Sequence, residues 1–253
     1  MNLSNFFPFI LIIVLALTSC GSVQKYPLAR FSLSETSGIT KVKFETGASR
    51  AVRLQPSEDL RANNISSTPI VSESVAPFIK PTFGLLDSVD IETYLGPKQG
   101  LYSGVKVQVM GAPMASAGEG NFSIAFKLGY SIYVAAEEIK AGESFATPKL
   151  DRALFIDSGY SSAEVLMGYR IIGPLQLTIG YFKDSGRYNL KFKEGSRTTI
   201  LHEVESIGPT LSLLFQPGLF FSTFSITQGN FKVSNRGIDN SYLNWGLNIG
   251  VIF

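Results

Sequence analysis

The chain has a single histidine, and its neighbours carry the functional groups of a nucleophilic hydrolase. His202 is followed by Glu203, Glu205 and Ser206. A Ser/His/acid triad needs the hydroxyl and the imidazole within hydrogen-bond reach, with the acid behind the ring. In an extended strand, His202 and Ser206 stand about 13 Å apart at about 3.3 Å per residue. We therefore expect no catalytic residue here, and a lipid-modifying enzyme centred on His202 is the least favoured function.

Other chemistries have less support. No set of Cys, His, Asp and Glu residues has the spacing of a metal site. The run Gly118-Glu119-Gly120 lacks the further glycine and the following helix of a phosphate-binding loop. We expect no metal and no cofactor. The net charge is only +2, and no basic stripe carries interleaved aromatic residues, so no nucleic acid is expected as a partner.

The only cysteine lies at the end of an apolar amino-terminal run. Phe6 to Leu17 has the length of a signal-peptide core and is too short to span a bilayer as a helix. The junction Leu17-Thr18-Ser19-Cys20-Gly21 resembles a lipobox, where bacterial signal peptidase II cuts before a diacylated cysteine. The resemblance implies a signal peptide over residues 1–19 and a lipidated Cys20. The alternative is an ordinary signal peptide, in which Cys20 has no role.

The last residues of the chain alternate in polarity. Six apolar residues share one parity, and the residues between them are small or polar except for Ile252. Successive side chains of a strand leave opposite faces, so the pattern predicts a strand with one apolar face. A terminal Phe after such alternation resembles the carboxy-terminal insertion signal of bacterial outer-membrane β-barrels. The residues that carry this resemblance are Trp245, Leu247, Ile249, Val251 and Phe253.

Alternation of period two recurs along most of the chain. The segments are Val75–Leu85, Val89–Leu95, Leu101–Val109, Phe122–Val134, Val165–Ile171, Leu175–Tyr181, Ile207–Phe215 and Phe220–Ile226. Charged residues make up only 17% of the chain, yet after residue 20 no apolar stretch reaches 18 residues. A chain that is apolar overall but never continuously apolar is typical of transmembrane strands, in which alternate residues face lipid.

The number of strands depends on the amino-terminal region. With the last strand there are nine segments, whereas single-chain bacterial barrels have an even number. A strand between about Ile39 and Leu54 would make ten, and leaving out Val75–Leu85 would make eight. We favour an all-β, antiparallel transmembrane barrel of ten strands, with eight as the alternative. Residues 20–68 are expected to be a lipidated tether with a possible first strand, and residues 69–253 the barrel.

The connections between strands predict the orientation. Short turns at 86–87, 173–174 and 216–218 are expected in the periplasm, and long connections at 134–162, 182–205 and 231–240 outside. One pair is reversed, because 111–120 is a longer periplasmic turn and 96–100 a short external loop. Either strand count leaves the amino terminus in the periplasm, with Cys20 in the inner leaflet of the outer membrane.

The inward positions of the predicted strands carry charges. A barrel of eight to ten strands is filled by its own side chains, and charges buried there must pair. Inward parity predicts four cations and three anions in the lumen. They are Lys80, Asp90, Glu92, Lys106, Lys127, Glu164 and Arg170. We expect a closed, salt-bridged lumen, and a narrow, porin-like solute path is the alternative.

The resemblance also implies a location and partners. It is to small outer-membrane β-barrel proteins of Gram-negative bacteria, which the barrel-assembly machinery inserts among outer-membrane lipid. The favoured function is a non-enzymatic integral barrel that presents its external loops, followed by the solute channel. No residue pattern names an external ligand.

Overall fold

The computed structural model describes residues 25–27, 30–55, 70–96, 100–139, 152–192, 199–233 and 238–253. These residues form eleven β-strands. The strands are β1 (Lys25–Pro27), β2 (Val42–Gln55), β3 (Ile70–Leu86), β4 (Val89–Gly96), β5 (Gly100–Met110), β6 (Phe122–Ile139), β7 (Arg152–Ile172), β8 (Leu175–Phe192), β9 (Thr199–Phe215), β10 (Phe220–Val233) and β11 (Ile238–Ile252). Within the described ranges, no helix has the length and hydropathy to cross a membrane.

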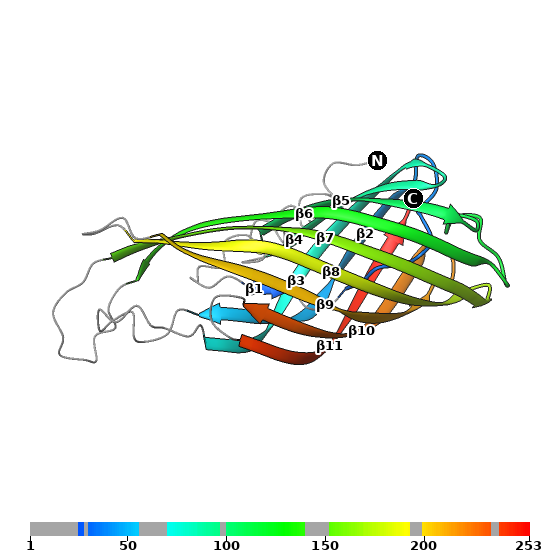
Figure 1. Cartoon of the computed structure of the whole chain (residues 1–253). Helices are drawn as coiled ribbons and strands as arrows, with labels where there is room; N and C mark the ends of the chain where they lie inside the picture. The colour runs from blue at the N-terminus through cyan, green and yellow to red at the C-terminus, as the bar shows by residue number, and fades with distance from the viewer. Residues whose placement is uncertain are drawn as a thin grey trace.

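Ten of the strands form a closed antiparallel barrel (Figure 1). Strands β2 to β11 pair in chain order, and β2 pairs with both β3 and β11, which closes the sheet. The short strand β1 adds to the edge of β2. The prediction of an all-β, ten-stranded antiparallel barrel is therefore confirmed. Its first wall strand is β2, so the wall begins at Val42 and not at residue 69.

The two ends of the barrel differ in their connections. The turn end holds Phe253 and the turns that follow β3, β5, β7 and β9, and the loop end holds the other connections. At the loop end, β6 to β9 project beyond the neighbouring strands (Figure 1). The predicted loops 134–162 and 182–205 were too long, because strands extend into them as far as Ile139 and Phe192 and begin again at Arg152 and Thr199. Hydrophobic alternation stops where the outer face becomes polar, although the hydrogen-bonded ladder continues.

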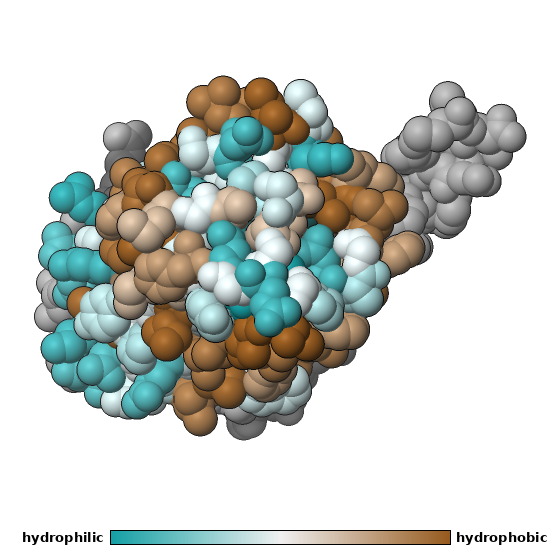
Figure 2. Space-filling view, turned by 90° about the vertical axis from the view of Figure 1, so that its right-hand side faces the viewer, coloured by the Kyte–Doolittle hydropathy of each residue, from teal (hydrophilic) through white to brown (hydrophobic). Residues whose placement is uncertain are grey.

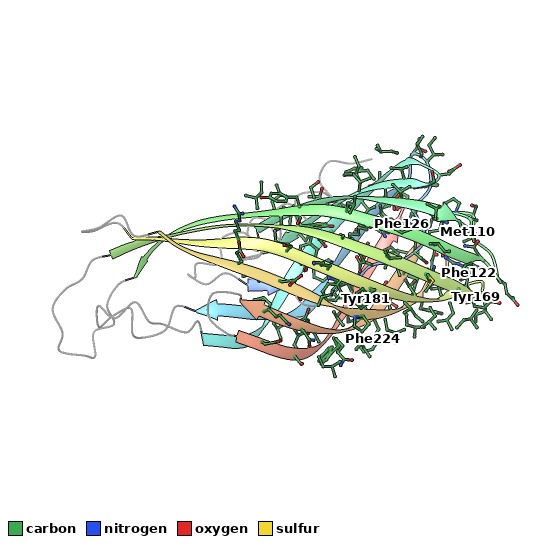
Figure 3. The ribbon with its side chains drawn as sticks, in the orientation of Figure 1. Met110, Phe122, Phe126, Tyr169, Tyr181 and Phe224 are labelled. Carbon is green, nitrogen blue, oxygen red and sulfur yellow. The ribbon has the colours of Figure 1, made fainter. Side chains whose placement is uncertain are left out.

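Side chains are distributed inside out. Among the described residues, 30 polar or charged side chains are buried, against 12 hydrophobic ones, and 33 large hydrophobic side chains are exposed. Six of the exposed ones are labelled in Figure 3, on the outer face of the strands. Seen from the turn end, hydrophilic residues gather in the middle and hydrophobic residues lie around much of the rim (Figure 2). Water-soluble proteins show the opposite preference for burial.

The longer turn between β5 and β6 folds over the turn end of the lumen. Met114 is buried in a hydrophobic cluster that includes Leu33, Phe221 and Ile252. The Met114 amide donates to the carbonyl of Thr36 at 2.7 Å. This turn is longer than its neighbours because it covers the lumen, which explains the longer member of the reversed pair of loops. The same cluster explains why Ile252 breaks the alternation of the last strand, since its side chain faces inward.

Candidate functional site: a charged lumen and its inner segment

A segment that precedes the wall runs through the lumen. We call residues Arg30–Ser37 the inner segment, and its last seven residues are at most 4% exposed. Eight extended residues span about 26 Å, close to the apolar height of about 25 Å of outer-membrane barrels. At the turn end, Gly38 adopts a φ of 100° and leads the chain into β2. Within the tether expected over 20–68, the possible first strand is present as β2, and residues 30–37 lie in the lumen.

The wall holds the backbone of the inner segment. Lys80 Nζ donates to a carbonyl of the segment at 2.8 Å, and Lys106 Nζ donates to the carbonyl of Glu35 at 2.7 Å. The amide of Ser37 donates to the Asp90 carboxylate at 2.9 Å. A segment without regular secondary structure would otherwise bury unsatisfied backbone groups, at a cost of about 1–3 kcal/mol each. Charged wall residues therefore supply what a neighbouring strand supplies elsewhere.

Side chains of the inner segment also form ion pairs with the wall. Glu35 is buried and pairs with Arg170, whose Nε donates to it at 3.2 Å. Near the loop end, Arg30 pairs with Asp184 of β8. Between them, the hydroxyl of Ser32 donates to a wall carboxylate at 2.6 Å. The segment is thus bonded to the wall at both ends and in its middle.

The wall charges form a network centred on one carboxylate. Glu92 is 1% exposed and lies 2.8 Å from Lys127 Nζ, 3.5 Å from Lys106 Nζ and 3.6 Å from Lys80 Nζ. Each lysine has a second acidic partner, such as Glu45 at 3.2 Å from Lys80. All seven charges predicted for the lumen are buried and ion-paired. They are Lys80, Asp90, Glu92, Lys106, Lys127, Glu164 and Arg170.

Sequence reasoning missed five further charges of the lumen. They are Arg30, Glu35, Lys43, Glu45 and Asp184. With them, the described lumen contains six cations and six anions. Strand parity would have found Lys43, Glu45 and Asp184, which continue the inward positions of β2 and β8. The two charges of the inner segment had no such signal, because the segment has no period.

Two wall glycines make room for the inner segment. A Cβ added at Gly246 on β11 would overlap the ring of Phe31, and one added at Gly168 on β7 would overlap the hydroxyl of Ser34. Both contacts are closer than a Cβ tolerates, so a larger residue would force the side chain of Phe31 or Ser34 to shift. The segment is therefore closely packed against glycines on two separate wall strands, β7 and β11.

A small cavity remains on the loop-end side of the inner segment. It measures about 60 Å³ and is lined by the start of the segment, by two lysines and by three tyrosines, Tyr94, Tyr102 and Tyr160. That volume holds a few water molecules, at about 10–15 Å³ each. In the described part of the chain, no three His, Cys, Asp or Glu side chains are grouped as metal ligands.

The triad residues are not brought together. Ser206 is buried and hydrogen-bonded to the hydroxyl of Tyr242 at 2.8 Å, whereas Glu205 faces outward and pairs with Lys183 at 2.8 Å. The side chain of His202 lies outside the described structure, and its backbone belongs to β9. An acid and a hydroxyl on opposite faces of one strand cannot serve the same imidazole.

The two remaining sets of predicted residues lie outside the lumen network. Cys20 lies outside the described residues. Of the carboxy-terminal set, Trp245, Leu247, Ile249 and Phe253 are each more than half exposed on the outer face, and Val251 is half-buried.

The side of the barrel from which the inner segment enters differs from expectation. Lys25 of β1 pairs with Arg53, at the end of β2 that is farthest from the Val42–Phe253 contact. The chain therefore begins its described course at the loop end and crosses the lumen before it turns into the wall. The expectation that the amino terminus lies on the same side as Phe253 counts only wall strands, whereas the described chain starts at Lys25 on the opposite side and makes this additional crossing.

No protein-family model and no curated protein matches the chain. Among solved structures, that of Ail, the attachment invasion locus protein of Yersinia pestis, in complex with the heparin analogue sucrose octasulfate, is 11% identical. The match covers 85% of this chain and 99% of that one, with a TM-score of 0.41. Neisserial surface protein A is 11% identical over 84% of this chain and 94% of its own, with a TM-score of 0.34.

The N-terminal β-barrel domain of Pseudomonas aeruginosa OprF is 12% identical over 85% of this chain and 99% of its own, with a TM-score of 0.29. Since all three TM-scores lie below 0.5, the function must be argued from this chain's own residues.

Proposed function

We propose that the protein is a non-enzymatic integral barrel of the bacterial outer membrane, closed by its own inner segment, which presents its loop end at the cell surface. The observation that carries the proposal is the inside-out burial of the wall, with 33 exposed large hydrophobic side chains around a lumen of paired charges. In water this surface would far exceed the apolar patches that soluble monomers expose. In a bilayer it is the required lining.

The contents of the lumen support a closed barrel over a solute channel. The inner segment runs along the lumen, and the turn that carries Met114 covers one end. Six cations and six anions in the described lumen pair with one another, so the lumen carries no net charge that would favour ions of one sign. Outer-membrane lipid and, during insertion, the assembly machinery are the partners of this proposal.

The proposal includes lipidation of Cys20. The lipobox-like junction ends at this cysteine, the only one in the chain. Cys20 precedes Lys25 of β1 by five residues, a reach of at most about 18 Å. With the loop end at the cell surface, the acyl chains would enter the outer leaflet and not the inner one. Labelled fatty acid should enter the natural chain but not Cys20→Ser, and equal labelling would contradict lipidation.

Cysteine labelling on intact cells tests the location and the orientation. In a Cys20→Ser background, a membrane-impermeant maleimide should label Gly195→Cys, between β8 and β9, and Gln24→Cys, just before β1. It should not label Pro217→Cys, in the turn between β9 and β10, until the cells are opened. Labelling of Pro217→Cys alone would invert the orientation, and equal labelling of all three would remove the membrane-spanning barrel.

A further inference from the structure

The pairing between β2 and β11 is incomplete. β11 pairs with β10 from Ile238 to Val251, but with β2 only over Gly246–Ile252. We call this junction between β2 and β11 the seam. On its other edge, β2 continues to Gln55 and keeps its pairing with β3. Within the described residues, the edge of β11 from Ile238 to Trp245 therefore has no partner strand.

Backbone groups point out of this edge. Phe253 and Val42 exchange two backbone hydrogen bonds, of 2.9 and 3.3 Å. The register between the two strands is unbroken, so every second residue back from Phe253 directs its N–H and C=O towards β2. In the stretch that lacks a partner strand on this side, these residues are Asp239, Ser241, Leu243 and Trp245. At the start of the opening, the Trp245 amide donates to the side chain of its neighbour Asn244 at 2.9 Å.

The place that β11 leaves on β2 is taken by β1. Arg53 of β2 pairs with Lys25 of β1. In the register by which Ser49 pairs with Gly246, the same Arg53 would lie opposite Tyr242 of β11. The two residues of β2 that precede Arg53 also pair with β1. β1 therefore occupies three positions on β2 that β11 would otherwise take. One edge of β2 cannot pair with both strands at these positions.

We propose that β1 and the first half of β11 compete for this edge of β2, and that the amino-terminal segment thereby holds the seam open at the loop end. An unpaired strand edge is a template for another strand, so release of β1 lets β11 close along β2. Three residues after β1, the amide of Arg30 donates to Thr227 Oγ1 at 3.3 Å, and its side chain pairs with Asp184. Occupancy of the seam is therefore coupled to the seating of the inner segment.

Disulfide cross-linking tests the competition. In the full chain with Cys20→Ser, refolded in detergent, the pair Lys25→Cys with Arg53→Cys reports β1 on the edge. The pair Arg53→Cys with Tyr242→Cys reports β11. A disulfide requires Cα atoms within about 7 Å, so each pair forms only when its strands are neighbours. We expect the first pair to cross-link and the second to cross-link slowly.

A release variant adds the decisive comparison. Tyr26→Pro removes the amide that bonds the edge of β2, and we expect it to raise the 53–242 cross-linking rate about fivefold, the equivalent of about one net hydrogen bond. Tyr26→Ala keeps this amide and should leave the rate unchanged. Unheated electrophoresis checks that each variant remains a folded barrel. If a variant loses the folded band, the proposal is tested by comparing the 25–53 and 53–242 cross-linking rates in the chain that retains Tyr26.

Three results would overturn the proposal. The 53–242 pair would form as fast as the 25–53 pair in the chain that retains Tyr26, or Tyr26→Pro would leave the 53–242 rate unchanged in a folded barrel. Cross-links between two chains would instead assign the edge of β11 to a second copy. None of these measurements depends on the membrane location, so their failure is separate from failure of the proposed function.

Discussion

The two halves of the barrel wall line the lumen with different chemistry. Among the described residues, β2 to β7 contribute nine inward charges, whereas β8 to β11 contribute only Asp184. The inward face of the second half carries Ser, Thr, Asn, Gly and a few apolar side chains. Its hydroxyls bond mainly across neighbouring strands, as in Ser212 with Ser225 at 2.6 Å and Thr210 with Thr227 at 3.3 Å.

The difference between the two halves indicates the role of the inward charges. We call β2 to β7 the charged half and β8 to β11 the hydroxyl half. Lysines and carboxylates of the charged half reach inward and form hydrogen bonds with the backbone of the inner segment, which has no strand partner. The hydroxyl half bonds the segment at fewer points, through Asp184, Gln176 and Thr227. It also lets the segment pack closely, as Phe31 does at Gly246. The charged half therefore supplies most of the bonds that hold the inner segment, and the hydroxyl half supplies fewer bonds together with a close fit.

The largest expected effect comes from the centre of the charged half. Glu92→Gln removes the carboxylate shared by three lysines, and we expect the free energy of unfolding to fall by about 3–5 kcal/mol, because buried cations lose a partner. Urea unfolding of the refolded chain in lipid vesicles measures this. The matched control is Glu205→Gln, an exposed pair with Lys183, which should change stability by less than about 0.5 kcal/mol. Similar losses for both variants would refute the charged network.

A cation on the outer face of the hydroxyl half should be costly in a different way. Leu247→Arg exposes a charge to lipid near mid-bilayer, and we expect insertion to be weakened by about 2–4 kcal/mol. Ser241→Arg lies on the same face of the same strand, about 20 Å closer to the loop end, and should cost about 0–1 kcal/mol. The yield of folded barrel on unheated electrophoresis compares them, and equal yields would contradict a membrane-facing belt.

A glycine from each half tests whether bonds or shape hold the segment. Gly246→Val in the hydroxyl half and Gly168→Val in the charged half both overlap the segment, and each should destabilise the barrel by about 1–3 kcal/mol. Protease digestion of the inner segment should increase in both variants. If Gly246→Val leaves the segment as protected as in the natural chain, close packing by the hydroxyl half plays no part.

The smallest effect is expected within the hydroxyl half itself. Ser212→Ala breaks the hydrogen bond to Ser225 and should lower the free energy of unfolding by about 1 kcal/mol. Protection of the inner segment should stay unchanged, because this bond joins two wall strands. Release of the segment by Ser212→Ala would erase the distinction between the two halves.

Strand periodicity accounts for how much could be predicted. Alternation of outward apolar residues indicated the barrel, nine of its ten strands and seven inward charges, because lipid and lumen impose opposite polarity on successive residues. The tenth strand followed from the even strand number of single-chain bacterial barrels. The inner segment escaped prediction for the same reason. Its Ser, Thr and Glu residues are buried among polar groups without a regular strand, so its composition matches that of an exposed tether. The projecting ends of β6 to β9 were missed because their outer faces no longer alternate in hydropathy.

Ion conductance in a planar bilayer tests the central claim that the inner segment closes the lumen. The natural chain is predicted to give a folded barrel without conductance steps. A variant in which residues 30–37 are replaced by alternating Gly and Ser loses both ion pairs and the packing of Phe31, and it should give discrete steps. Conductance steps of equal size from both proteins would contradict the claim, because the lumen would then be open whether or not the segment is seated.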